Sequence, residues 1–364
     1  MSGAIVTSGS YATVQMDMAK MFEHVCRRCR ISPTVAAEDH AQAFIDIVNM
    51  LTASLANRGA LLWTLTPFVL GFNPGVGQYA MPSGAEDVVS DGLFRTVVRE
   101  SGGTAASSAG GTATNAFDGD LDTACTQTVP NGNISYQFTE ATRVLSVGVV
   151  SNGNANYTLA VEVSNDGATW TEVLDTGLQS YVDRYPRWFD IAAPASAGYV
   201  RVRETGGAIL NVREVVFATQ INEVPIARIS LDQYNNYPNK SFQSTFVNSF
   251  YVDKQVPNLI TYVWPVPQDF TTSLFVRMKR LIMSVPGFTD DDGNDIMIEL
   301  PQRWHLAMIK GLAREFAREL PEVTEDLIAR LDKDYVLDSL PEAESAERDP
   351  TPTYLTPNLR PYTA

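Results

Sequence analysis

Apolar residues near the start of the chain recur every three or four positions, which is the spacing of an amphipathic helix. One stripe comprises Met18, Met21, Phe22 and Val25, and a second comprises Phe44, Ile47, Val48, Leu51 and Leu55. Between them, Ser32-Pro33 fits an N-cap residue followed by proline at the first helical position. Gly59 follows the second stripe, as glycine commonly does after a helix. The pattern predicts two helices between Met16 and Arg58.

The same patterning predicts short strands and further helices on both sides of a middle region. Strands are expected at 63–70 and 78–81, and again at 259–264 and 274–281. A long amphipathic helix should begin at Pro301, with Trp304, Met308, Leu312, Phe316 and Leu320 on one side, and another should span 323–340. From Pro341 onward the chain is rich in proline, so it is predicted not to be helical.

The character of the sequence changes near Glu100. Residues 101–113 consist almost only of Ser, Gly, Thr and Ala, a composition typical of flexible linkers. From there to Phe217 short β-branched or alternating segments follow one another, separated by turns such as Asn152-Gly153. This pattern predicts an antiparallel β-sandwich or jelly roll.

We therefore predict a multidomain α+β protein with a mainly helical core, small β elements and an inserted β-sandwich. The predicted parts are an N-terminal core part at 1–103, the sandwich at 104–217, a C-terminal core part at 218–340 and an extended tail at 341–364. The length of 364 residues fits two or three domains.

Composition limits the classes of function. A net charge of −15 argues against a general nucleic-acid binder, because neutralising phosphates requires clustered Lys and Arg. Three cysteines do not make a disulfide framework. No apolar run is long enough to span a bilayer, and the first residues lack a signal-peptide pattern, so no membrane partner is expected and synthesis is expected in the cytoplasm.

Catalytic motifs are missing from the sequence. His24, His40 and His305 are the three histidines, and none has a recognisable catalytic spacing. Cys26 and Cys29 form a C-x-x-C pair without the second pair that a zinc site usually needs. We predict that the protein is not an enzyme, with a cell-wall hydrolase as the least favoured alternative, since sequence alone does not exclude a catalytic carboxylate pair.

Four landmarks in the middle region resemble discoidin-like domains, also described as coagulation-factor C-type or galactose-binding-like domains. In order, they are Asn115-Ala116-Phe117-Asp118-Gly119-Asp120-Leu121-Asp122-Thr123, Val163-Ser164-Asn165-Asp166-Gly167-Ala168-Thr169-Trp170, Tyr199-Val200-Arg201-Val202-Arg203, and Glu214. The resemblance implies an eight-stranded jelly roll whose end loops often bind sugars, lipids or proteins.

The same resemblance implies a possible structural calcium ion, with no other cofactor required. Its oxygen ligands would come from Asp118, Asp120, Thr123 and Glu214. The alternative is a turn rich in Asp whose carboxylates accept hydrogen bonds from backbone amides. The sequence leaves both interpretations open.

Aromatic residues of the sandwich are candidates for stacking on a sugar. The chain has Cys125 where family members usually carry Trp, so the family's aromatic platform cannot be carried over directly. The candidates for ligand binding are Tyr157, Tyr181, Tyr185 and Trp188. The alternative is that they are core residues, the more common use of aromatics in a sandwich.

The flanking segments resemble the head-to-tail adaptors of short-tailed phages, known as tail accessory or packaged-DNA stabilisation proteins. The resemblance rests on the 43–55 helix followed by Leu61-Leu62-Trp63, the 221–231 segment before Tyr234, the run Tyr262-Val263-Trp264-Pro265-Val266-Pro267, and Glu299-Leu300-Pro301 before a helix. It implies a structural virion protein at the head-tail junction, docked on the portal ring as a ring of its own, twelvefold by expectation. Packaged DNA would pass through its channel without specific binding, and tail tube, nozzle or tail-fibre proteins would attach below.

The C-terminal tail is the expected portal interface in this interpretation. The candidate residues are Pro341, Pro350, Pro352, Tyr354, Leu355, Pro357, Leu359 and Tyr362, since a segment without its own fold can order against a partner.

From Glu319 to Asp349 there are eleven acidic and three basic residues. This excess of negative charge fits either a solvated helix face or a channel wall that repels DNA. The sandwich would project outward for docking or glycan contact. The alternative function is that of a carbohydrate-binding virion adhesion protein.

Overall fold

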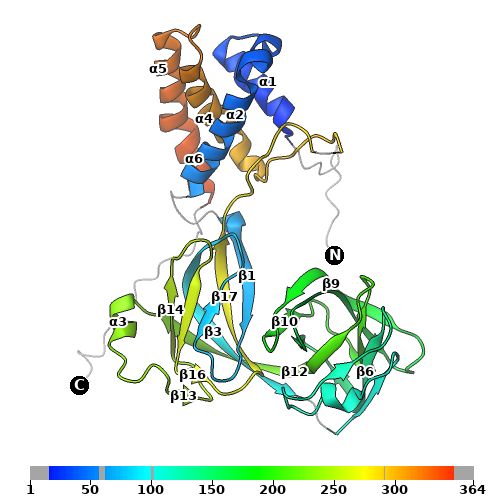
Figure 1. The fold of residues 1–364 in the computed structure, drawn as a ribbon. Helices are drawn as coiled ribbons and strands as arrows, with labels where there is room; N and C mark the ends of the chain where they lie inside the picture. Colours follow the sequence, from blue (N-terminus) through cyan, green and yellow to red (C-terminus); the bar gives the residue numbers. More distant parts are fainter. Residues whose placement is uncertain (1–15, 57–61, 100–101, 291, 348–364) are drawn as a thin grey trace, which may run out of the picture. The chain divides into compact units, whose positions relative to one another are not determined.

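The computed structural model describes residues 16–56, 62–99, 102–290 and 292–347. The chain divides into two compact units, one formed by Met1–Thr64 with Leu281–Ala364 and the other by Leu65–Arg280 (Figure 1). We call them the helical unit and the β unit. The boundaries between the units fall after residues 64 and 280. The sequence prediction instead placed the domain boundaries after residues 103, 217 and 340.

Two helices open the helical unit where the apolar stripes predict them. Helix α1 spans Met18–Cys29, and helix α2 spans Pro33–Ala56. The Asp17 carboxylate accepts a hydrogen bond from the Lys20 amide at 2.7 Å, which caps the first helix. Pro33 is the first residue of α2, as predicted from the Ser32-Pro33 pair.

The C-terminal part of the helical unit continues further than predicted. It contains the 3₁₀ turn η3, helices α4 and α5, the π-helical segment η4 and helix α6, which span Gln302–Trp304, His305–Glu319, Glu325–Lys333, Asp334–Ser339 and Leu340–Ala346. The prediction that the chain is not helical from Pro341 onward is wrong for this first part, because a proline in the first turn of a helix lacks only an amide that would have no partner there. Pro341 is exposed on α6, whereas Pro350, Pro352, Tyr354, Leu355, Pro357, Leu359 and Tyr362 lie outside the described residues.

The core of the helical unit is aromatic at its centre. Phe316 of α4 lies 5.5 Å from Phe44 and 5.9 Å from Phe22 between ring centroids, and both contacts are edge-to-face. Trp304 is also buried, and its indole N–H donates to the Glu347 carboxylate at 2.9 Å. The end of α6 is thereby bonded to the start of α4.

The described residues contain more strand than helix, so the protein is not built on a mainly helical core, and this corrects the sequence prediction. Strands make up 39% of the described residues and helices 27%. The sheet strands that the sequence prediction missed are β3 at Ala85–Arg99, the second half of β12 at Asn211–Arg228 and β14 at Ser249–Asp253. Acidic residues and Gly92 interrupt the alternation in β3, so its apolar pattern is weak and only pairing with its neighbours defines the strand.

The part of the β unit outside the sandwich is a sheet with the strand order β1-β17-β3-β12-β14-β15-β2. In addition to β3 and β12, its strands are β1 at Leu65–Gly71, β2 at Gln78–Ala80, β14 at Ser249–Asp253, β15 at Ile260–Trp264 and β17 at Thr272–Arg280. Four of them coincide with the predicted strands. Helix α3 at Leu231–Asn235 and the small pair β13–β16, at Gln243–Ser244 and Val266–Pro267, lie in the connections.

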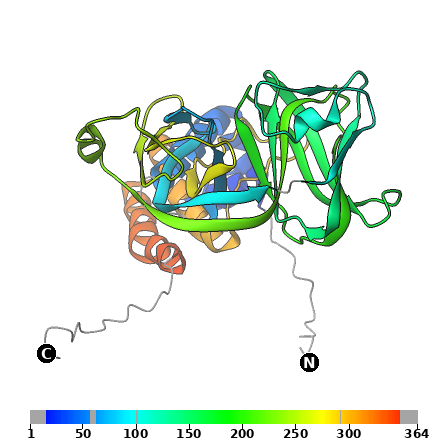
Figure 2. The same cartoon turned by 90° about the horizontal axis from the view of Figure 1, so that it is seen from below.

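Strand β12 runs from the sandwich into this sheet (Figure 2). From Val212 to Ala218 the strand pairs with sandwich strand β7, and from Ala218 to Ile226 it pairs with β3. A strand that hydrogen-bonds in both parts forms a continuous connection rather than a hinge.

Two sheets face each other in the sandwich, as predicted for a jelly roll. One has the order β4-β6-β11-β8-β9, and the other combines β5, β7 and β10 with the first half of β12. The first sheet comprises Thr104–Ser107, Asn133–Arg143, Ser196–Glu204, Ala155–Ser164 and Thr171–Tyr181. Strands β5, β7 and β10 span Cys125–Thr126, Ser146–Ser151 and Pro186–Asp190.

Residues 102–113 of the expected flexible linker are instead part of the sandwich. Strand β4 pairs with β6, and the 3₁₀ turn η2 follows at Ala113–Ala116. Small residues are required for packing here, because a Cβ atom on Gly103 would lie 2.3 Å from the Gln137 carbonyl oxygen. Linker-like composition therefore reflects close packing at this site.

None of the helices among the described residues is long and apolar enough to cross a membrane.

Candidate functional site

The predicted calcium loop of the sandwich is closed by its own hydrogen bonds. The Asp118 carboxylate accepts from the Asp120 amide at 2.9 Å and from the Thr123 hydroxyl at 2.8 Å. The Asp120 carboxylate accepts from the Asp122 amide at 2.9 Å. These are the bonds of a turn rich in Asp, the alternative that the sequence left open.

Glu214 lies beneath this loop and is fully buried. Its carboxylate accepts hydrogen bonds from Arg99 Nη1 at 2.8 Å and from the Gly119 amide at 3.1 Å. Burial raises the pKa of Glu214 to about 7, although the Gly119 amide and the Arg99 guanidinium act in the opposite direction. The guanidinium packs directly on Gly119, where a Cβ atom would lie 2.6 Å from Nη1.

The four predicted calcium ligands do not fit the ion in this arrangement. Calcium usually binds six to eight oxygen atoms. Here the Arg99 guanidinium already provides the positive charge that pairs with Glu214. The Asp118 carboxylate is likewise occupied, because it accepts a hydrogen bond from the Thr123 hydroxyl. Among the described residues, no group of three or more His, Cys, Asp or Glu side chains is arranged to hold a metal. Sequence reasoning missed Arg99, whose only signal was a basic residue immediately before the insert.

We expect calcium to leave the stability of the protein unchanged. Adding millimolar CaCl₂ or EGTA should shift the melting temperature by less than about 1 °C, since an ion that does not bind the folded state adds nothing to its stability. Differential scanning fluorimetry measures this directly, with MgCl₂ as the matched control for ionic strength. An increase of several degrees with calcium alone would contradict the interpretation.

The four aromatic candidates do not form an exposed platform. Tyr157, Tyr181 and Trp188 are buried, and the rings of the two tyrosines lie 5.4 Å apart. Tyr157 is a sandwich core residue whose hydroxyl bonds to the backbone of Asn211, which is the alternative that the sequence left open for these aromatics. Tyr185 is half-buried, with its ring edge-to-face against Tyr79 at 6.0 Å.

Tyr181, Tyr185 and Trp188 nevertheless line one groove of about 960 Å³. We call it the β1–β10 groove, because most of its walls come from β1 and from the 180–190 segment that contains β10. Polar side chains of Arg187, Asp190 and Asn258 also line it. Its volume lies within the range typical of pockets for small ligands.

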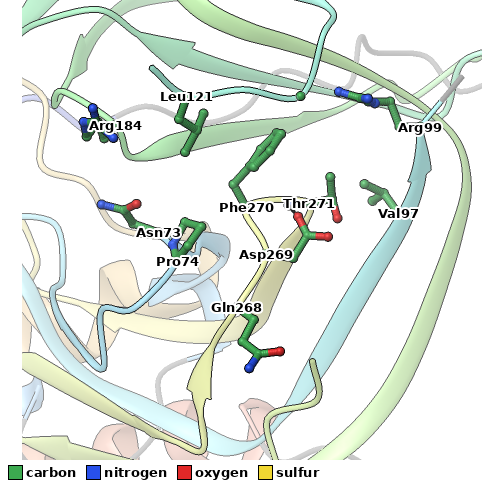
Figure 3. A pocket seen from close by; sticks show the side chains of 11 residues that line it. Asn73, Pro74, Val97, Arg99, Leu121, Arg184, Gln268, Asp269, Phe270 and Thr271 are labelled. Carbon is green, nitrogen blue, oxygen red and sulfur yellow. Dashed lines mark hydrogen bonds between the residues drawn. The ribbon is translucent and has the colours of Figure 1, made fainter. Parts of the chain in front are cut away.

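A second cavity of about 650 Å³ lies between the calcium-like loop and the neighbouring sheet (Figure 3). Arg99 and Arg184 lie on opposite sides of it, with Phe270 between them. Both guanidinium groups already have carboxylate partners, since Arg99 pairs with Glu214 and Arg184 pairs with Asp122. The cavity therefore offers no unpaired charge from these residues to a ligand.

The C-x-x-C pair is structural. Cys26 and Cys29 are buried in α1, while His24 is exposed. Burial raises the pKa of the Cys26 thiol to about 11 and that of the Cys29 thiol to about 12, so both remain protonated. Protonated, buried thiols do not serve as metal ligands or nucleophiles.

The fold and the loop define a discoidin-like jelly roll, and comparison with known proteins agrees. Residues 102–215 match the family model described as F5/8 type C domain. This match confirms the resemblance drawn from the four sequence landmarks. The chain thus contains a discoidin-like F5/8 type C domain within its β unit.

Solved carbohydrate-binding modules are similar to this part of the chain. A family 32 module of AlyQ, in complex with 4,5-unsaturated mannuronic acid, is 19% identical, with 32% of this chain and 95% of that chain covered and a TM-score of 0.29. A family 32 module of Clostridium perfringens NanJ, in complex with galactose, is 16% identical, with 33% and 96% covered and a TM-score of 0.30. A chitosan-binding module from Paenibacillus sp. IK-5 is 24% identical, with 31% and 92% covered and a TM-score of 0.27. No curated protein sequence matches the chain.

Proposed function

We propose that this protein is a non-catalytic carbohydrate-binding protein, and that its β unit holds the glycan. The match of residues 102–215 to the F5/8 type C domain is the observation that carries the proposal. Jelly rolls of this kind are a common architecture of lectins. The β1–β10 groove adds aromatic surface for the C–H face of a sugar ring, beside polar side chains for its hydroxyl groups.

The proposal is tested by applying the full-length protein to a glycan array. We expect reproducible binding to a limited set of glycans, competed by the same free oligosaccharide. A heat-denatured sample is the control for adhesion to the array. If no glycan binds above this control, the proposed function is wrong.

A separate incubation with oligosaccharide tests the absence of catalysis. We expect oligosaccharide incubated with the protein to be recovered with unchanged mass, because the proposed role is binding alone. Mass spectrometry after prolonged incubation at several pH values measures this. Shortened products would favour the glycoside or cell-wall hydrolase alternative.

We propose as a second candidate that the helical unit is the docking part of a virion connector at the head-tail junction. The helical unit exposes large apolar side chains, including those of Met50, Met283 and Leu337, at 64%, 72% and 61% of their full area. Exposed apolar residues of this size favour a protein partner. Portal and tail proteins are the partners expected for such a connector, with the acidic C-terminal helices beside passing DNA.

Mixing the full-length protein with its cognate portal tests the connector proposal. A ring-shaped complex in electron micrographs is the expected result. The variant M50E places a negative charge on the exposed face of α2, and it should weaken the complex if α2 contributes to the interface. Absence of any complex with the wild-type protein would argue against this role.

A further inference from the structure

The β1–β10 groove lies between two strands that each pair on one side only within the described sheet. Strand β1 pairs with β17, and β10 pairs with β7. The two strands come together closely at one point, because a Cβ atom on Gly71 would lie 2.0 Å from the Pro186 carbonyl oxygen. From there the groove extends along both strands, with β2 residues at one side. Both the sandwich and the neighbouring sheet therefore contribute walls.

Two buried polar atoms at this groove have no hydrogen-bond partner in the described part of the chain. They are the Tyr181 hydroxyl and the Trp188 indole N–H, on side chains that are 2% and 6% exposed. A buried polar group without a partner costs about 1–3 kcal/mol. Both side chains line the groove, so a ligand that pairs with these two atoms would lie there.

One polar side chain with spare hydrogen-bonding capacity lines the same groove. The Asn258 amide, which is half-buried, has no hydrogen-bond partner among the described residues, and it can both donate and accept. Tyr185 adds a half-buried ring at the same wall. An aromatic ring beside an amide is the combination that recognises a sugar, whose ring has an apolar face and hydroxyl edges.

The charged groups of the groove are already compensated. Arg187 donates to the Ser180 carbonyl at 2.6 Å and also to the Gln179 side chain. Asp190 accepts from Arg95 at 2.8 Å. No strong unpaired charge from these two residues remains to attract a charged ligand, and this favours a neutral one.

We propose that the β1–β10 groove is the glycan site and that it takes a neutral oligosaccharide. This inference rests on the proposed function and makes the site composite: residues of the sandwich bind the sugar together with Asn258 and β1 from outside the F5/8 type C domain. An extended peptide added to the strand edges is the competing occupant.

The test measures binding of three neutral tetrasaccharides, of galactose, glucose and N-acetylglucosamine, to full-length protein by isothermal titration calorimetry. Variants Y181F and N258A each remove one hydrogen-bonding group, and we expect each to weaken binding about tenfold, as the loss of one such bond does. Variant Y157F is the matched control, because the Tyr157 hydroxyl bonds inside the sandwich and is absent from the groove lining. It should bind as the wild type does, and far-UV circular dichroism spectra that match the wild type verify that all variants fold.

The outcomes separate the inference from the proposed function. If the wild type binds a tetrasaccharide and Y181F and N258A bind it equally well, the groove is not the site, while the proposed function stands. If the wild type binds neither the tetrasaccharides nor any arrayed glycan, both fail. A titration with an extended peptide of alternating Val and Thr tests the competing occupant. If this peptide binds, no tetrasaccharide does and the two variants weaken the peptide, the glycan inference is overturned.

Discussion

Replacing Arg99 by alanine is expected to lower the free energy of unfolding of the β unit by about 3 kcal/mol. Arg99 Nη1 donates to Glu214 at 2.8 Å, the Glu214 side chain is fully buried, and Arg99 itself is 28% exposed. Removing the guanidinium leaves a buried carboxylate without its counter-charge. Urea denaturation followed by circular dichroism measures the loss.

The matched control is Arg184→Ala, on the opposite side of the same cavity. Arg184 pairs with Asp122, and the two side chains are 43% and 77% exposed. Ion pairs this exposed contribute about 0–1 kcal/mol, so this variant should lose little stability. Equal losses for the two variants would show that the burial of Glu214 does not matter.

The cost of the Arg99 substitution should depend on pH. The pKa of Glu214 in the folded protein, about 7, lies above its ordinary value of 4.5, so in the wild type this group lowers stability as the pH rises from 4.5 to 7. Without Arg99 the carboxylate holds its proton more tightly still. We therefore expect the smallest loss near about pH 5, where Glu214 is protonated, and the largest near about pH 8. A loss independent of pH would contradict the role of Glu214.

Replacing Phe316 by alanine is expected to cost about 3–5 kcal/mol, concentrated in the helical unit. The ring is fully buried and contacts Phe22 and Phe44, so the substitution leaves a cavity among three helices. This aromatic cluster lies wholly within the helical unit. Hydrogen exchange should show lost protection in α1, α2 and α4 and unchanged protection in β8 and β11.

Met50→Ala is the control for this substitution. Met50 lies on α2 of the same unit and is 64% exposed, so its truncation should change the free energy of unfolding by less than about 0.5 kcal/mol. If Phe316→Ala instead reduced hydrogen-exchange protection in β8 and β11 as strongly as in α4, the two units would unfold together rather than independently.

The elements that sequence predicted correctly are those defined by local patterns. Stripes at helical spacing predicted α1, α2 and α4, and Ser32-Pro33 predicted where α2 begins. Ordered landmarks from Asn115 to Glu214 predicted the discoidin-like domain, which the family match confirms. Each stripe, cap or landmark is formed by residues that are neighbours in the sequence, so a single sequence is enough to recognise it.

The candidate site depended on contacts that no local pattern records. Arg99 and Glu214 are 115 positions apart and meet because β3 and β12 pair, and β3 itself had too weak an alternation to be predicted. Three of the four aromatic candidates belong to one groove, but only the packing of β1 near β10 creates it. Sequence determined the domain type and the helices, whereas long-range strand pairing decided which charges, rings and cavities lie together. The physical reason is that pairing depends on the combined burial and hydrogen bonding of distant segments, which their separate patterns do not contain.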